Sequence, residues 1–365
     1  MSRFTRREFV GSSAALPLGL GLAAGARAGA TAGATEVPAA GAASMIVTGA
    51  NVITMDGDNP RAEALAIRGD RLLAVGADED VLQHAGAGTQ RIDARGLTVT
   101  PGFIDAHSHP LFAGEAVGVN VNLRRIGDVK RALAAKAAQT PPGHWIRGVM
   151  YDDTKFEDAR PLDRRDLDEA VPDHPVYVGH RGGHTGVVNS KAFEMAGITN
   201  RTPDPDDGRY FRENGELTGK VAEHARDVFF EVGTWPVIDR AVRQRAAEIA
   251  SRNMAAAGLT STTDAYGTLN DLIAYQDARD VGELRFRLSF MPGGRSEVYA
   301  GLKTAGVRSG FGDETIRIGA VKFSADGSAS ERTMYMSTPY EGTDDHGILT
   351  MTQEQIDAAV DDAVA

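Results

Sequence analysis

An apolar segment, residues 97–109, ends in two histidines one position apart, His107 and His109. Its β-forming residues turn at Pro101-Gly102 and continue to the histidines, after which Pro110 stops the strand. Alternate residues of a strand project from the same face, so the two imidazoles can converge on one cation. Imidazole is a good ligand for divalent metals such as zinc. The segment therefore predicts a strand of an α/β fold with a metal site at its carboxyl end.

The composition narrows the classes of protein and ligand. The chain has 365 residues, a net charge of -11 and no cysteine. Because no block of Lys and Arg stands out, we do not expect nucleic-acid binding. Without cysteine there is no disulfide, thiolate nucleophile or Cys-ligated zinc, so a metal must be held by His, carboxylate or water. The length allows about two domains, or one large α/β domain with an appendage.

The first residues are typical of an export signal. Arg6 and Arg7 form a twin-arginine pattern, a Gly/Ala-rich stretch follows, and residues 26–28 offer a small-x-small cleavage site. We predict a Tat signal peptide and linker over residues 1–35, with the Tat translocase as export partner and a periplasmic or secreted bacterial protein as the product. The apolar run is too short and Gly-rich for a stable membrane anchor. An unstructured basic N-terminus with an accidental arginine pair is the alternative.

Residues 44–98 are expected to form a small β module. Four short β-type runs are separated by Gly-containing turns, at residues 45–47, 51–55, 64–67 and 72–75. The turn at residues 68–71, built on Gly and Asp, predicts a hairpin. A short helical piece at 79–82 and a strand at 90–93 follow. So many short strands favour a sandwich-like layer over a parallel sheet.

Residues 100–109, preceded by this β module, resemble the first barrel strand of the amidohydrolase superfamily. The resemblance covers most of the chain from about residue 45 and is strongest to the amidohydrolase family 3 branch, which includes N-substituted formamide deformylases. Further segments resemble the family in the expected order. They are the entry into the second barrel strand (161–178), the Gly-His…Asn-Ser motif (183–192), the third strand (258–264) and the fourth strand with its Lys…Asp-Gly-Ser signature (316–328).

The resemblance implies an α/β fold, a TIM (β/α)8-barrel metallo-dependent hydrolase with an N-terminal part of a small composite β-sandwich. We expect the β module at 44–98 and the barrel at 99–365, with an insertion at about 120–225. Only about four barrel strands can be recognised, whereas closure requires eight, so we expect a barrel truncated after them. The last helix is predicted to begin with a capping box between Thr352 and Gln355.

The resemblance also implies a third metal ligand, Lys322. Carbon dioxide can carboxylate the matching lysine of the superfamily to a carbamate, an anionic oxygen ligand for one or two divalent ions, here expected to be zinc. A buried ammonium at the end of an apolar strand needs a partner, and metals would repel it, whereas a carbamate is attracted to them. The alternative is a lysine that pairs with Asp326 or extends to the barrel mouth.

Four further groups are candidates for the site. His184 lies in a Gly-rich loop and is implied as a catalytic residue that positions the carbonyl or stabilises developing negative charge. A loop histidine bonded to the backbone is the alternative. Arg181 and Asp326 are expected to bind substrate, and Asp264 either supports the site or caps a helix. The remaining histidines of polar, turn-like segments are assigned structural roles: His144, His174, His224 and His346.

The implied activity is hydrolysis of a carbon–nitrogen bond other than a peptide bond, through metal-activated water. The substrate would be a small-molecule amide, an N-substituted formamide or a related cyclic compound. Two more histidine ligands and an Asp general base are expected beyond residue 365. Glu331 departs from the family pattern and is expected to add an acid near the mouth, which leaves the substrate open. An inactive fragment or a non-catalytic exported binding protein of the same fold is the alternative, and homo-oligomerisation is left open.

Overall fold

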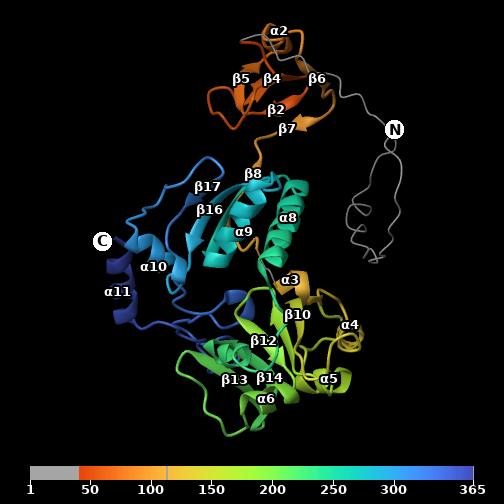
Figure 1. Ribbon diagram of the computed structural model, residues 1–365, viewed down its shortest axis with the longest axis vertical. Coiled ribbons are helices and arrows are strands. Elements are labelled where there is room, and N and C mark those ends of the chain that lie inside the picture. The colour runs from red at the N-terminus through yellow and green to blue at the C-terminus, as the bar shows by residue number, and fades with distance from the viewer. Residues whose placement is uncertain (1–40, 112–113, 365) are drawn as a thin grey trace. The chain divides into compact units, whose positions relative to one another are not determined.

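The structure is a computed structural model that describes residues 41–111 and 114–364 (Figure 1). The predicted twin-arginine signal, including Arg6 and Arg7, lies outside the described residues. Two compact units divide the chain, Met1–Pro101 and Gly102–Ala365. Among the described residues, none of the helices combines the length and the apolar character that a membrane crossing requires.

The first unit contains two small sheets. The larger has the order β5-β4-β1-β6, with bounds Arg71–Gly76, Ala64–Arg68, Met45–Thr48 and Gln90–Asp93. The smaller has the order β3-β2-β7, with bounds Arg61–Ala62, Asn51–Ile53 and Thr98–Val99. Ile46 packs with Val81 of helix α2 (Asp78–Leu82), whereas its neighbour Val47 packs with Val52 of the smaller sheet. Both faces of β1 are therefore buried, since successive side chains point to opposite faces.

The predicted hairpin is confirmed. Strands β4 and β5 pair antiparallel with Arg68 opposite Arg71. Gly69 in the turn has φ 63°, in the left-handed region that favours glycine. The predicted strand at 90–93 is β6, and it pairs parallel with β1.

The second unit carries a parallel four-stranded sheet. Its order is β17-β16-β15-β8, with bounds Ile316–Ile318, Arg287–Pro292, Leu259–Gly267 and Phe103–Ser108. The helices that alternate with these strands are α8 (Arg240–Ala256), α9 (Leu269–Asp280) and α10 (Glu297–Thr304) (Figure 1). Ala247, Tyr275 and Phe290 belong to one core between these helices and the sheet. Because all four strands are parallel, their carboxyl ends meet at one edge, where polar side chains can share a site.

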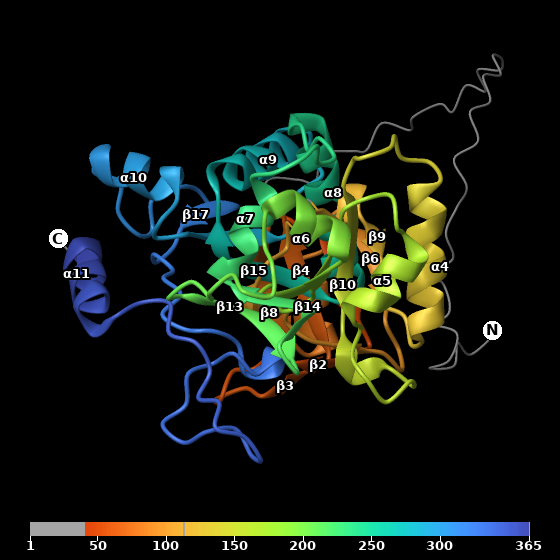
Figure 2. The same ribbon diagram turned by 90° about the horizontal axis from the view of Figure 1, so that it is seen from below.

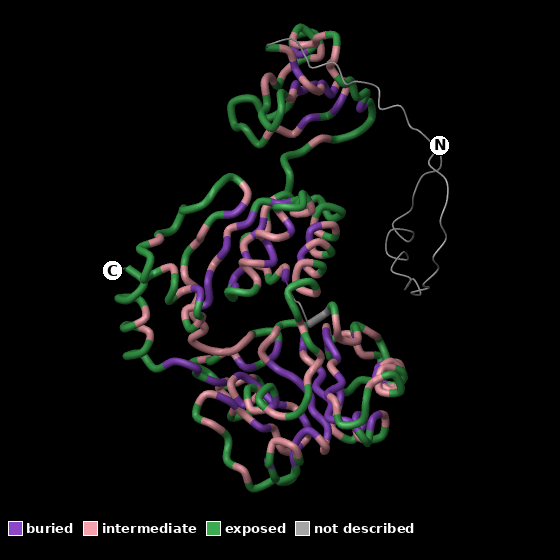
Figure 3. Tube along the Cα trace, viewed as in Figure 1, coloured by how far each residue is buried: buried purple, intermediate pink, exposed green. Residues whose placement is uncertain are grey.

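Strand β8 stands at the edge of this sheet and is poorly covered (Figure 3). Phe103 is 60% exposed and Ile104 is 73% exposed. Within the described chain β8 pairs with β15 alone, so its other edge offers unpaired backbone groups.

The prediction for the second barrel strand is wrong. Residues Val176–His180 form β11, which pairs with β10 (Ile146–Tyr151) and β12 (Thr185–Val188) and not with β8. The strand predicted as third, β15, lies next to β8 instead, and the unpredicted β16 separates it from β17. An apolar run favours a buried strand, but it does not determine which sheet the strand joins.

A six-stranded mixed sheet lies between β8 and β15 in the sequence (Figure 2). Its order is β13-β14-β12-β11-β10-β9, and the strands not yet bounded are Gly208–Glu213, Glu216–Glu223 and Val119–Asn120. Val178 of β11 packs with α4 (Ile126–Ala137) and α5 (Arg164–Ala170). The adjacent Tyr177 packs in a second core with α6 (Ser190–Ala196) and α7 (Asp227–Phe230). Helices therefore cover both faces of this sheet. A short helix, α3 (Gly114–Val117), precedes it.

The segment after β17 contacts the six-stranded sheet before the last helix. Arg209 of β13 lies 2.6 Å from the Asp345 carboxylate. The predicted capping box at α11 (Gln353–Val364) is confirmed: Thr352 N donates to Gln355 Oε1 (2.8 Å), and Gln355 N donates to Thr352 Oγ1 (3.3 Å). The mixed α/β class is confirmed, whereas the truncated barrel and the composite β-sandwich stay predictions.

Candidate functional site

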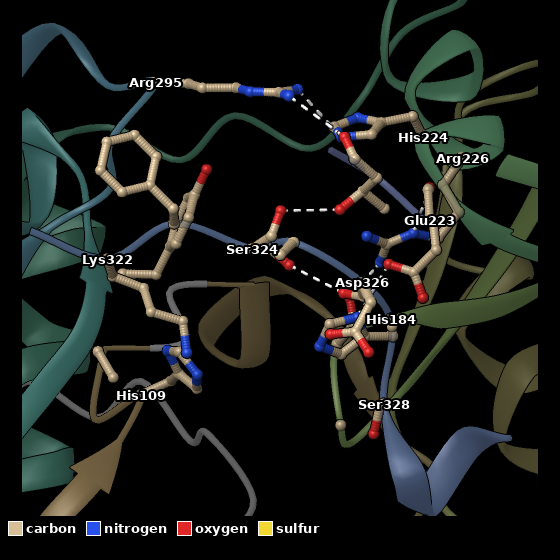
Figure 4. A pocket seen from close by; sticks show the side chains of 18 of the residues that line it. His109, His184, Glu223, His224, Arg226, Arg295, Lys322, Ser324, Asp326 and Ser328 are labelled. Carbon is tan, nitrogen blue, oxygen red and sulfur yellow. Dashed lines mark hydrogen bonds and ion pairs between the residues drawn. The ribbon is translucent and has the colours of Figure 1, made fainter. Parts of the chain in front are cut away.

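A cavity of about 950 Å³ opens at the carboxyl edge of the parallel sheet (Figure 4). Its walls come from the ends of β8 and β15, from the segment after β17, from the β11–β12 loop and from the end of β14. The cavity brings together six of the residues predicted for the site: His107, His109, Arg181, His184, Lys322 and Asp326.

The two predicted histidine ligands lie at the end of β8. Their ring centroids are 5.7 Å apart and their planes cross at 80°. Burial lowers the pKa of His109, and the positive charges of His107 and Lys322 lower it further. A lowered pKa favours the neutral imidazole, which is the form that binds a metal ion.

Asp264 of β15 lies behind His109. One carboxylate oxygen, Oδ1, is 3.9 Å from His109 Nδ1, and the other accepts a 2.8 Å hydrogen bond from the Tyr275 hydroxyl. Burial raises the pKa of Asp264 to about 7. The side chain does not cap α9, because Thr268 is the N-cap of that helix. Asp264 is therefore the carboxylate nearest to His109 Nδ1, at a distance longer than a hydrogen bond, in a place from which a carboxylate can orient a metal-binding histidine.

Lys322 follows β17 and extends the parallel register. It forms a β-bridge with Gly293, and Gly294 N donates to its carbonyl (2.8 Å). Its side chain points toward His109 (Figure 4). No carboxylate of the described residues lies within 4.0 Å of its amine, and Asp326 accepts instead from Tyr335 N (3.0 Å). The alternative in which Lys322 pairs with Asp326 is therefore wrong.

His184 faces the cavity from the β11–β12 loop. Its Nδ1 lies 2.9 Å from Oε2 of Glu223, the last residue of β14. Its side chain is 29% exposed. The buried Glu223 fixes the ring and leaves the other ring nitrogen available. The alternative, in which the His184 ring bonds to the backbone, is wrong, because the partner of the ring is the Glu223 side chain.

Glu331 was expected to add an acid near the mouth, but the residue is buried and does not line the cavity. The residue ends η3 (Ala329–Glu331), is 5% exposed and accepts hydrogen bonds from Thr185 N (2.6 Å) and His184 N (3.2 Å). Its Oε2 is also 3.3 Å from Nδ1 of His180. Burial opposes ionisation, but the hydrogen bonds from His180 and Thr185 outweigh it and lower the pKa of Glu331. Glu331 thus holds the loop that carries His184.

Asp152, Asp153 and His180 form a second group with ligand atoms all within 4.8 Å of one another. Protein cations already neutralise it, since Arg181 Nε lies 2.7 Å from Asp152 and Lys155 Nζ lies 3.4 Å from it. Burial disfavours a charged His180, yet Asp153 and Glu331 raise its pKa to about 9. A protonated imidazole has no lone pair for a metal, so this group does not fit one. Arg181 lines the cavity with its charge paired.

Several residues of the cavity were not predicted. Arg295 follows β16, a strand that the alternation of Leu288 and Phe290 could have revealed. Glu223 and Arg226 lie at and after the end of β14, as does His224, which was assigned a structural role and in fact lines the cavity. Their own segments contain no motif, and only the folding of β14 beside β12 brings them to the cavity.

Comparisons with known proteins identify the family of this chain. Residues 90–365 match the amidohydrolase family. The N-substituted formamide deformylase of Arthrobacter pascens is 31% identical over 258 residues, 68% of this chain and 47% of that protein. The protein LONG AFTER FAR-RED 3 of Arabidopsis thaliana is 30% identical over 67% of this chain and 42% of its own length. The chain thus spans about half the length of these relatives.

The solved structure of an uncharacterized metal-dependent hydrolase of Pyrococcus horikoshii has the same fold over most of this chain. Its TM-score is 0.60 at 22% identity, and the match covers 88% of this chain and 62% of that protein. The family match extends over most of the chain and includes every residue of the cavity. The chain therefore belongs to the amidohydrolase family, in its family 3 branch.

Proposed function

We propose that the chain carries part of the active site of a hydrolase that cleaves a carbon–nitrogen bond other than a peptide bond. The observation that supports this most is the meeting of His107, His109 and Lys322 at one cavity, with Asp264 behind His109. The donor set fits a divalent cation such as zinc: two imidazoles, one with a lowered pKa, and an amine without an acidic partner in the described chain.

The two histidines and a carboxylated Lys322 would hold one or two ions. The ammonium first loses one proton; the neutral amine then joins carbon dioxide and releases a second proton, which leaves an anionic oxygen donor in place of a cation. A divalent ion bound there supplies a Lewis acid that polarises a carbonyl and makes water a stronger nucleophile.

His184 is the group of this chain placed to act on the substrate. With Nδ1 held by Glu223, its other ring nitrogen can donate to the carbonyl oxygen and stabilise negative charge as it develops. Glu331 fixes the loop on which His184 stands, which limits the motion of the ring.

We propose an amide or an N-substituted formamide as the substrate class, since the Arthrobacter pascens relative bears the name of a formamide deformylase. Export by the Tat pathway to the periplasm belongs to the same proposal and is supported by Arg6 and Arg7. A non-catalytic binding protein of this fold, or an inactive fragment of the enzyme, is the competing possibility.

A zinc titration of the full chain tests the metal site. We expect stoichiometric binding by isothermal calorimetry, with a loss of at least about tenfold in affinity in His107→Asn and in His109→Asn, because each removes one of a few ligands. His84→Asn is the matched control, because His84 belongs to the other unit and lies outside the cavity. Equal zinc binding by all four proteins would exclude this site, and no binding by any would favour the inactive alternative.

A further inference from the structure

We infer that the substrate carries a carboxylate and that Arg295 binds it. This inference rests on the proposed function and names the substrate class of the same site. Arg295 follows β16 and lines the cavity. The preceding Gly294 donates its N–H to the carbonyl of Lys322 (2.8 Å), so the two cationic residues come from adjacent positions at the edge of the sheet.

The contacts of Arg295 leave its charge without an acidic partner. Its Nη1 lies 3.3 Å from Nε2 of His224, and its Nη2 lies 3.5 Å from the carbonyl of Thr350 (Figure 4). His224 Nδ1 in turn lies 2.7 Å from Asp227. With a proton on Nδ1 shared with Asp227, Nε2 is a lone-pair acceptor for Arg295. Throughout the described chain, no carboxylate lies within the 4.0 Å limit of an ion pair with Arg295.

The other arginines of the cavity are differently occupied. Arg181 is paired with Asp152 at 2.7 Å. Arg226 donates to the backbone carbonyls of Glu223 (2.9 Å) and Gly183. Arg295 is exposed and has at most two of its five N–H groups engaged, one of them at the long limit of a hydrogen bond. A guanidinium of this kind, held in place by neutral groups, is suited to bind an anion from the cavity.

A carboxylate fits better than a phosphate. The planar guanidinium fork matches either anion through two parallel hydrogen bonds. The cavity, however, is also lined by five acidic residues: Glu223, Asp227, Asp264, Asp271 and Asp326. Their charges repel a dianion more strongly than a monoanion, so the site favours an acyl or formyl amine whose other end carries one carboxylate.

The test compares two probes on the full zinc-loaded chain, N-formyl-L-phenylalanine and its neutral primary amide, by isothermal calorimetry. We expect the carboxylate to bind at least about tenfold more tightly than the amide, with the preference falling as salt is raised. Arg295→Met should remove the preference, and Arg295→Lys should keep part of it. Arg287→Met, at the opposite end of the same strand and outside the cavity, should leave it unchanged.

The outcomes separate this inference from the proposed function. Equal binding of the two probes, no measurable binding of the carboxylate, or a preference that survives in Arg295→Met would each overturn the role of Arg295. The metal site is measured independently by the zinc titration, so it can stand while this inference fails. The thermal unfolding of Arg295→Met should match that of the unsubstituted chain, because the side chain is exposed.

Discussion

At residue 331, a buried carboxylate joins the segment after β17 to the loop that carries His184. Glu331 accepts from the backbone of His184 and Thr185 and lies beside His180, whose pKa is raised to about 9 by Asp153 and Glu331. His180 has a second acid, Asp153, at 3.5 Å. The buried contact between Glu331 and His180 thus anchors the β11–β12 loop and limits the positions that His184 can take.

Replacing this carboxylate should destabilise the fold in a pH-dependent way. Glu331→Gln is expected to lower the free energy of unfolding by about 3 kcal/mol near neutral pH, because it leaves His180 with one acidic partner. The raised pKa of His180, about 9 against an ordinary 6.5, stabilises the folded state fully below about pH 6.5, and this contribution is lost as the pH rises through 9.

Urea unfolding between pH 6 and 10 measures this effect. The decline of stability with rising pH should begin near pH 6.5 in both proteins, but in Glu331→Gln it should be smaller in total and should end at a lower pH than in the unsubstituted chain. Glu341→Gln, at an exposed position, serves as the control and should change neither stability nor slope. Identical pH profiles for all three proteins would contradict the ion pair.

At the scale of elements, helix α9 supports the candidate metal site through a single buried side chain. Tyr275 is fully buried, and its hydroxyl donates to Asp264 of β15, the carboxylate beside His109. The helix begins with its own capping box, Thr268 and Asp271, which leaves Asp264 free for the site. A helix that packs against the sheet therefore also sets the position of a group behind a predicted ligand.

Tyr275→Phe tests this support. The change leaves a buried carboxylate oxygen without its donor and should cost about 1–3 kcal/mol of unfolding free energy. Zinc affinity should fall as well, by about tenfold, because Asp264 is no longer held beside His109. Tyr335→Phe, on an exposed ring, should alter neither quantity. A Tyr275→Phe protein with normal stability and normal zinc binding would argue against this role.

At the scale of the whole molecule, the parallel sheet has an open edge. Strand β8 has one partner in the described chain, and its exposed Phe103 and Ile104 place apolar surface at that edge. Unpaired strand edges with apolar side chains favour association between chains.

We therefore expect the 365-residue chain to self-associate as its concentration rises. Ile104→Thr should weaken the association measured by sedimentation equilibrium at least about threefold, with little change in unfolding free energy, since the side chain is 73% exposed. Val237→Thr is a control of similar chemistry at another exposed site, 77% exposed, outside the strands and helices. A monomer at every concentration would refute the expectation.

Local sequence determined the features whose cause lies within a few residues. The hairpin at Gly69, the helix start at Thr352 and the strand β8, at whose end His107 and His109 lie, follow from turn chemistry, capping and alternation, which act over short distances. The resemblance to a known family is carried by residues 100–109 and 316–328. It predicted the class of fold and named Lys322 as a candidate metal ligand.

Tertiary structure alone decided which strands pair and which polar groups meet. The apolar run in β11 could join either sheet, and only its packing against β10 and β12 settled the choice. Glu331 became a buried partner of His180, and Arg295 came to lie beside His224, across 151 and 71 positions of sequence respectively. Contacts of this range depend on how whole elements pack, because burial and pairing are properties of the assembled sheets and no short pattern in the sequence encodes them.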